Sequence, residues 1–385
     1  MGQNKAEAGD TIVTIHLSKT KLWEVDSEHP QESGLFEAAA LLQAGGTVAF
    51  PTETVYGLGA DARRTEAVER IFEAKGRPSD NPLIVHISDR AQLAELTAPL
   101  EGASAALAAQ LMDRFWPGPL TIVLPVKPGA VSPRVTAGLA TVAVRMPAHP
   151  VALRLIAASG CPLAAPSANR SGRPSPTLAS HVRDDLSGLI DGIVDGGAAG
   201  VGLESTVVEV DGDTVRILRP GGVTAEGLRE IAARVEYDAV AAPGAGGTAT
   251  AAEAESAAAE VQTPRSPGMK YAHYAPQGEM RLVKGELGAV SAYIAAEVRA
   301  AQARGERTGV LAFAEHAARY DADCVLAVGS LAQLESAAQG LYHALREFDR
   351  RGVQRIWAET CPEEGIGHAL MNRLSKAAGH AVVYV

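Results

Sequence analysis

The sequence predicts two α/β domains: a twisted mixed sheet with helices, linked to a second, smaller, doubly wound domain. Three observations support this fold class. Short apolar strands alternate with helices along most of the 385 residues, a pattern typical of α/β proteins. A chain of this length exceeds the usual size of one hydrophobic core. A change of composition after about residue 238 separates two such alternating regions.

The first region starts with an extended segment at 11–25 and a helix at 32–43, whose apolar residues follow helical spacing up to Gly45-Gly46. Its other expected elements are strands at 47–50, 83–87, 120–125, 141–145, 163–165, 190–195, 205–210 and 214–218, and helices at 66–75, 104–114 and 151–159. The last two strands flank Asp211-Gly212-Asp213, which is typical of a hairpin turn.

Residues 239–264 are almost entirely Ala, Gly, Glu, Thr and Pro, with hardly any large apolar side chain. Such a stretch cannot form a core, so we expect a flexible linker. The predicted domains are therefore 18–237 and 277–385, joined by a linker at 238–276.

The second region has expected strands at 281–283, 308–313, 324–327, 353–359 and 381–385, and helices at 331–350 and 366–378. The first of these helices has one apolar face, an Arg-rich last turn and a terminal Gly352.

Composition limits the functional classes. Hydrophobic residues make up 46% and charged residues 21%, as in average globular proteins. The formal net charge of −10 argues against a dedicated nucleic-acid surface, because phosphate contacts need clustered Lys and Arg. We also expect no membrane association, since no apolar run reaches 18 residues and the start is polar.

The three cysteines, Cys161, Cys324 and Cys361, are widely spaced and form no CxxC pair. We therefore expect buried core thiols, neither a disulfide framework nor a zinc site, in a cytoplasmic protein.

Thr52-Glu53-Thr54 follows a strand that ends at Pro51 and precedes Gly57 and Gly59. This pattern can deliver hydroxyls and backbone N–H groups to a crevice at the end of a strand, where open α/β sheets bind ligands. An ordinary turn explains the segment equally well. Gly57, Gly59 and Ala62 also match a loose dinucleotide fingerprint, but the strand–turn–helix setting and the acidic residue are missing.

Two cations, Lys75 and Arg77, lie in a loop between a helix and a strand. They supply the point charge and the planar donor fork that a triphosphate needs. Alternatively, they satisfy the dipole at the end of their helix. His86 lies in the apolar strand that follows, where a histidine is more often a core residue than a ligand.

Ser167-x-Asn169 and Glu204-Ser205-Thr206 are small polar clusters beside predicted strands, and either can bind phosphate or form a simple turn. Arg145 ends a strand, where a buried guanidinium requires a carboxylate or phosphate partner. The sequence contains no P-loop, HExxH, GxSxG or kinase signature.

Five segments, taken in their order along the chain, resemble the long form of the threonylcarbamoyl-AMP synthase family. They are 51–59 (PTETVYGLG), Lys75-x-Arg77, Ser167-x-Asn169, 204–206 and 266–276 (SPGMKYAHYAP). In that family a YrdC-like catalytic domain is linked to a Rossmann-like domain. The resemblance implies a nucleotidyltransferase that forms threonylcarbamoyl-AMP and pyrophosphate from L-threonine, bicarbonate or CO2, and ATP. The product serves the N6-threonylcarbamoyladenosine modification of tRNA at position 37.

The resemblance also implies roles for individual residues. L-Threonine would be held by Thr54, His86, Arg145, the backbone of Ala165, and Ser205, with Arg145 taking the carboxylate. ATP would be surrounded by Lys75, Arg77, Asn81, Thr141, Ser167, Asn169, Ser175 and Arg219, with Lys75 and Arg77 as the catalytic pair. Mg²⁺ would be carried by the phosphates, with no protein ligand assigned.

Both the carbamate and its adenylate are labile, so the site must exclude water. Tyr271, His273 and Tyr274 in the linker are candidates for a lid over the nucleotide. The alternative is a rigid connector whose tyrosines pack between the domains.

Three other functions stay open. They are a carbamoyltransferase or another adenylate-forming enzyme, a non-catalytic RNA-binding module, and a regulatory nucleotide sensor. The expected partner is a downstream tRNA-modifying transferase that receives the adenylate, without stable nucleic-acid binding. The sequence assigns no role to the C-terminal domain.

Overall fold

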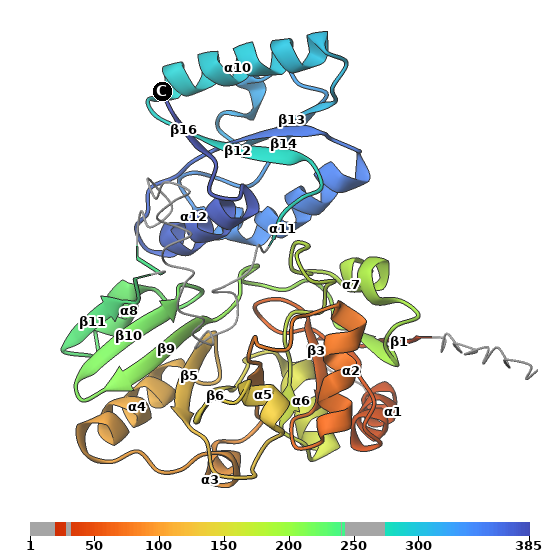
Figure 1. Ribbon diagram of the computed structural model, residues 1–385, viewed down its shortest axis with the longest axis vertical. Helices are drawn as coiled ribbons and strands as arrows, with labels where there is room; N and C mark the ends of the chain where they lie inside the picture. Colours follow the sequence, from red (N-terminus) through yellow and green to blue (C-terminus); the bar gives the residue numbers. More distant parts are fainter. Residues whose placement is uncertain (1–19, 28–31, 240, 243–273) are drawn as a thin grey trace, which may run out of the picture.

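The computed structural model describes residues 20–27, 32–239, 241–242 and 274–385. Two units, each built on its own sheet, lie one above the other (Figure 1). The last strand of the first sheet ends at Tyr237, and the first strand of the second sheet begins at Glu279. Most of the expected linker, including Tyr271 and His273, lies outside the described residues.

The first sheet is mixed and has eleven strands among the described residues, in the order β1-β8-β2-β3-β7-β4-β6-β5-β9-β10-β11. These strands are β1 (Lys21–Glu24), β2 (Val48–Phe50), β3 (Gly57–Asp61), β4 (Ile84–His86), β5 (Leu120–Pro125), β6 (Thr141–Arg145), β7 (Leu163–Ala164), β8 (Gly192–Asp195), β9 (Thr206–Asp211), β10 (Thr214–Arg219) and β11 (Arg234–Tyr237). The predicted hairpin is confirmed, because β9 and β10 pair antiparallel and Gly212 has a φ of 60°.

Helices cover both faces of this sheet. They are α1 (Glu32–Gln43), α2 (Thr65–Lys75), α3 (Leu93–Leu96), α4 (Gly102–Phe115), α5 (Pro133–Thr136), α6 (Pro150–Ser159), α7 (Ala179–Leu186) and α8 (Ala225–Arg229). Neighbouring residues of a strand point to opposite faces. Val48 and Phe50 therefore pack in one cluster with α1 and α6, whereas Ala49 joins the cluster that contains α2 and α4.

The second sheet has five parallel strands in the order β14-β13-β15-β12-β16. Its elements are β12 (Glu279–Lys284), α10 (Leu287–Ala303), β13 (Thr308–Ala312), β14 (Cys324–Ala327), α11 (Leu334–Arg350), β15 (Arg355–Glu359), α12 (Ile366–Ala377) and β16 (Val382–Tyr384). Helix α10 covers one face, while α11 and α12 cover the face toward the first unit (Figure 1). The predicted fold class is confirmed.

The strand at Gly57–Asp61 was not predicted. These residues form β3, antiparallel to β2, so residues 51–56 are a tight connection between two strands. The glycines make room for a neighbouring ring, since a Cβ on Gly59 would lie 2.8 Å from Cε1 of Phe50. A glycine within a strand is no phosphate-binding turn, which excludes the dinucleotide fingerprint.

Other details also differ from the expectations. Helix α7 and strand β11 were missed, and Phe36 of α1 is 56% exposed despite its place in the apolar pattern. The three cysteines are buried free thiols, as predicted. Within the described part of the chain, no helix has the length and apolar character needed to cross a membrane.

Helix α11 packs against the end of β14 at a glycine. A Cβ on Gly340 would overlap the carbonyl oxygen of Val328. The close approach fixes the position of α11 and of the side chains that it directs toward the first unit.

We expect Gly340→Ala to destabilise the protein by roughly 1–3 kcal/mol, because the added methyl must displace backbone atoms. The control is Gly288→Ala in α10, where the added methyl meets only the exposed Glu286 side chain. Its expected effect is neutral to about 1 kcal/mol stabilising, from helix propensity. Urea unfolding measures both, and equal stabilities of the two variants would contradict the close-packing argument.

Candidate functional site

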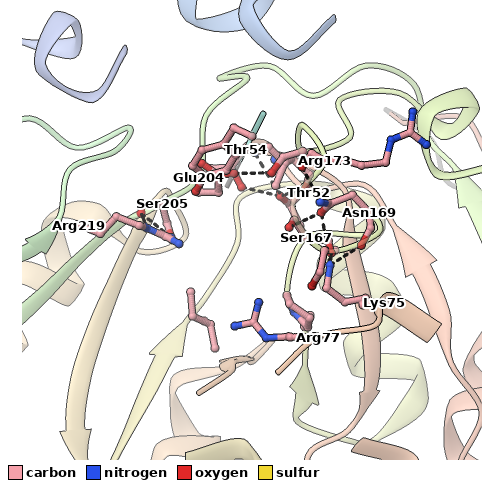
Figure 2. Close-up of a pocket in the computed structure, with 18 of the residues that line it drawn as sticks. Thr52, Thr54, Lys75, Arg77, Ser167, Asn169, Arg173, Glu204, Ser205 and Arg219 are labelled. Atoms are coloured by element: carbon pink, nitrogen blue, oxygen red, sulfur yellow. Dashed lines mark hydrogen bonds between the residues drawn. The ribbon is translucent and has the colours of Figure 1, made fainter. Parts of the chain in front are cut away.

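A cleft with about 730 Å³ of space between atoms lies beside the carboxyl ends of β4, β6 and β10 (Figure 2). The predicted residues that line it are Thr54, Lys75, Arg77, His86, Arg145, Ala165, Ser167, Asn169, Ser175, Ser205, Arg219 and Tyr274. Asn81 and Thr141 do not line it, and their contact with ATP stays a prediction.

Lys75, at the end of α2, is hydrogen-bonded to the loop that contains Ser167 and Asn169. Its Nζ donates to the carbonyl oxygens of these two residues at 2.5 and 2.6 Å. The Ser167 hydroxyl in turn donates to Oδ1 of Asn169 at 2.6 Å. Burial, followed by the nearby Arg77 charge, lowers the pKa of Lys75 well below its usual value. Lys75 thus fixes this loop at the wall of the cleft.

Arg77 lines the same cleft as Ser167, so the two residues share one cavity as the hypothesis requires. Its Nη2 donates to the carbonyl oxygens of Asn81 and Pro82 at 3.4 and 3.1 Å. In Figure 2 the guanidinium extends into the space between Lys75 and Arg219.

Arg145 and His86 are neighbours in the register of the parallel strands β6 and β4. The Arg145 guanidinium lies 2.6 Å from a carboxylate oxygen of Glu53 and donates to Oγ1 of Thr54 at 2.9 Å. The expected carboxylate partner of Arg145 is thus present in the chain itself. Glu53 is not among the residues that line the cleft, so it holds Arg145 from outside.

Ser205 and Arg219 form another group at the ends of β9 and β10. Nη2 of Arg219 donates to the carbonyl oxygen of Ser205 at 2.8 Å and to its hydroxyl at 3.2 Å. The Ser205 hydroxyl also lies 2.8 Å from Oγ1 of Thr121 on β5. Three strands therefore fix one hydroxyl at the wall of the cleft.

The site includes residues that were not predicted from the sequence. Thr52, Val55, Gly57, Ile84, Pro166, Ser171, Gly172, Arg173 and Glu204 also line the cleft. Glu204 is the one acidic side chain among the described lining residues, and its neighbours Ser205 and Thr206 already marked the segment. Burial alone would raise the pKa of Glu204, but the charges of Arg373 and Arg219 lower it to about 2.

Tyr274 is the one residue of the proposed lid that the structure describes. It is buried, lines the cleft and stacks on Tyr342 of α11 with ring centroids 5.3 Å apart. Its position agrees with packing between the units and also with contact to a ligand. The lid function stays a prediction.

No group of three or more His, Cys, Asp or Glu side chains that could hold a metal ion occurs among the described residues. The single acidic residue of the described cleft wall, Glu204, is bonded to Ser175 and to an arginine. The donor set therefore fits a phosphate group better than a protein-bound cation.

His86 is buried beside Arg145, and this burial, followed by the arginine charge, lowers its pKa to about 3. Its Nδ1 lies 3.4 Å from the carbonyl oxygen of Ile84. The imidazole is neutral at physiological pH, so it can offer one lone pair to a substrate.

This shift predicts a pH-dependent stability. The folded pKa is below the usual 6.5, so the His86 contribution is present above pH 6.5 and is lost as pH falls toward 3. We expect the wild type to lose about 2 kcal/mol more unfolding free energy between pH 7 and pH 5 than His86→Gln. Urea unfolding at both pH values measures this difference, and identical losses in the two proteins would refute it.

Two family models match nearly the whole folded chain. The model described as "Telomere recombination" (Sua5_yciO_yrdC) matches residues 40–221, and the threonylcarbamoyl-AMP synthase C-terminal domain matches 223–379.

Relatives of known name cover both units. The threonylcarbamoyl-AMP synthase of Bacillus subtilis is 50% identical over 95% of this chain and 99% of its own. That of Pyrococcus abyssi is 45% identical over 90% of this chain and 95% of its own. The crystal structure of P. abyssi Sua5 complexed with L-threonine matches with a TM-score of 0.85 and 43% identity, covering 95% of this chain and all of the other. The chain therefore belongs to the threonylcarbamoyl-AMP synthase family, in its form with two domains.

Proposed function

We propose that this protein synthesises threonylcarbamoyl-AMP, with pyrophosphate as the second product, from L-threonine, bicarbonate or CO2, and ATP. One observation supports this function above the others. Groups suited to phosphate, around Lys75 and Arg77, and groups suited to an amino acid, around Arg145 and His86, line one cleft. A reaction that joins an amino acid to a nucleotide needs both sets together.

At the amino-acid end, Arg145 takes the carboxylate of L-threonine. Its guanidinium has five N–H groups, enough to bind a substrate in addition to Glu53 and Thr54. Neutral His86, the Ser205 hydroxyl and the backbone of Ala165 surround the amine and the side-chain hydroxyl. The P. abyssi relative was crystallised in complex with L-threonine, which supports L-threonine as a substrate.

At the nucleotide end, Lys75, Arg77 and Arg219 face the phosphates. An anionic triphosphate favours the ammonium form of Lys75, against the burial that lowers its pKa. Ser167, Asn169 and Ser175 form the polar wall of the cleft beside the nucleotide, and Asn81 and Thr141 complete the predicted set. Mg²⁺ would be carried by the phosphates, with no protein ligand assigned.

The chemistry has two steps. The threonine amine attacks the carbon of CO2 with loss of a proton to solvent, or the carbon of bicarbonate with loss of water, and gives an N-carboxylate. An oxygen of this carbamate then attacks the α-phosphorus of ATP, the bond to the bridging β-phosphate oxygen breaks, and pyrophosphate leaves. The protein contributes position and positive charge, which stabilise the charge that develops on the leaving phosphates.

The product then passes to a tRNA-modifying transferase, which uses it for the N6-threonylcarbamoyladenosine modification at position 37. The acidic net charge of −10 agrees with a protein that hands over a small molecule and does not itself hold tRNA stably.

We expect pyrophosphate release by the wild type to require L-threonine, bicarbonate and ATP together. Arg77→Ala and Lys75→Ala should each reduce the rate about 100-fold or more, as for the loss of a preorganised charge in a buried site. The control is Arg134→Ala, which removes an exposed guanidinium that pairs with Glu69 outside the cleft, and it should keep its activity within about twofold.

Two outcomes would contradict this function. Release of pyrophosphate without L-threonine would favour another adenylate-forming activity or a carbamoyltransferase-like reaction. Tight ATP binding without any turnover would favour a nucleotide sensor.

A further inference from the structure

Glu204 connects the cleft wall to the second unit. Its Oε1 accepts from the Ser175 hydroxyl at 2.5 Å and from the Tyr342 hydroxyl at 3.0 Å. Its Oε2 accepts from Tyr342 at 2.8 Å and from Nε of Arg373 at 2.8 Å. Ser175 and Glu204 belong to the first unit, whereas Tyr342 and Arg373 belong to α11 and α12 of the second.

Arg373 contacts two segments of the cleft wall at once. Its side chain is fully buried, and Nη2 donates to the carbonyl oxygen of Pro220 at 2.9 Å. Pro220 follows Arg219, and Glu204 precedes Ser205. One guanidinium therefore joins the two segments that carry the Ser205–Arg219 pair.

The approach of the second unit is close at this point. A Cβ on Gly202 would overlap backbone atoms of α11. Within the first unit, a Cβ on Gly221 would overlap the backbone at Glu204 and Ser205, so the two segments that Arg373 contacts are also packed closely together. Val55 and Leu203 of the first unit also belong to the same apolar cluster as Tyr342. The contact is thus part of a packed core, and its geometry cannot shift without strain.

We propose that Arg373 and Tyr342 are positioning residues for the nucleotide. Both act through Glu204 on Ser175, and Arg373 also acts through the carbonyl of Pro220 on the neighbouring Arg219. This inference rests on the proposed function and gives the C-terminal domain a role in it. A buried carboxylate that lost either partner would turn toward the remaining donors. Its bond to the Ser175 hydroxyl would then change, and so would the cleft wall.

A contact that joins the two units away from the cleft distinguishes positioning of the nucleotide from mere docking of the units. Other contacts also join the two units, and one of them, Gln339 Nε2 to the carbonyl oxygen of Gly200 at 2.5 Å, lies at the exposed rim. Neither Gln339 nor Gly200 lines the cleft. Gln339→Ala is therefore the matched control for loss of a contact between the units.

The test uses the full chain with three variants, Tyr342→Phe, Arg373→Lys and Gln339→Ala. Tyr342→Phe keeps the ring that stacks on Tyr274 and removes only the hydroxyl. We expect kcat/KM for ATP to fall about tenfold for Tyr342→Phe and about 100-fold for Arg373→Lys, as for loss of hydrogen bonds to a charged group. The KM for L-threonine should change less than about twofold, and Gln339→Ala should behave as the wild type.

A double-mutant cycle tests whether Tyr342 acts on the nucleotide site through Glu204. In a Glu204→Gln background, Tyr342→Phe should have little further effect on kcat/KM for ATP, because both changes interrupt the same chain of hydrogen bonds. Additive effects would overturn the proposal. It would also be overturned if Tyr342→Phe had the same kcat/KM for ATP as Gln339→Ala. The same holds if the catalytic efficiencies for ATP and for L-threonine fell together, in proportion to the fall in melting temperature.

The experiment also separates this inference from the proposed function. If the wild type releases no pyrophosphate, the proposed function fails, and calorimetric ATP binding then decides the positioning role. About tenfold weaker ATP binding by Tyr342→Phe supports it, and unchanged affinity overturns it.

Discussion

The central constraint on this fold is the burial of cations that have to face a substrate. Lys75, Arg145 and Arg219 are each at most 5% exposed, and a buried charge is stable only when polar partners satisfy it. Each cation finds its partners in a different sequence motif. Carbonyl oxygens of the 167–169 loop accept from Lys75, Glu53 pairs with Arg145, and the carbonyl of Ser205 accepts from Arg219. The motifs therefore depend on one another, because each supplies the acceptors that another requires.

This mutual dependence explains what could be predicted from the sequence. Polar residues next to apolar strands marked the cleft wall, since the ends of neighbouring strands meet at one edge of a sheet. The partner of Arg145 could not be predicted, because local patterns do not reveal which carboxylate reaches a guanidinium across the sheet. Strand β3 was missed for a similar reason: glycine is unfavourable in strands, and only the Phe50 ring above Gly59 explains its presence.

The contribution of the second unit to the cleft wall could not be predicted from the sequence. Arginines are almost never fully buried, so Arg373 on α12 would be assigned to the surface. Tyr342 lies next to Leu341 of the apolar face of α11, and its hydroxyl acquires a partner only when the two units dock. Residues that act across a docked interface carry no local signal in either domain. They become visible only in the folded chain.

The same constraint accounts for the choice of substrates. The protein as a whole is acidic, yet the cleft wall contains Lys75, Arg77, Arg145, Arg173 and Arg219 against the single carboxylate of Glu204 among the described lining residues. Because the chain itself already holds these cations in place, little reorganisation accompanies the arrival of an anion, which is the condition for strong electrostatic stabilisation in a dry site. A positive cavity in a negative molecule selects for compact polyanions such as a nucleoside triphosphate.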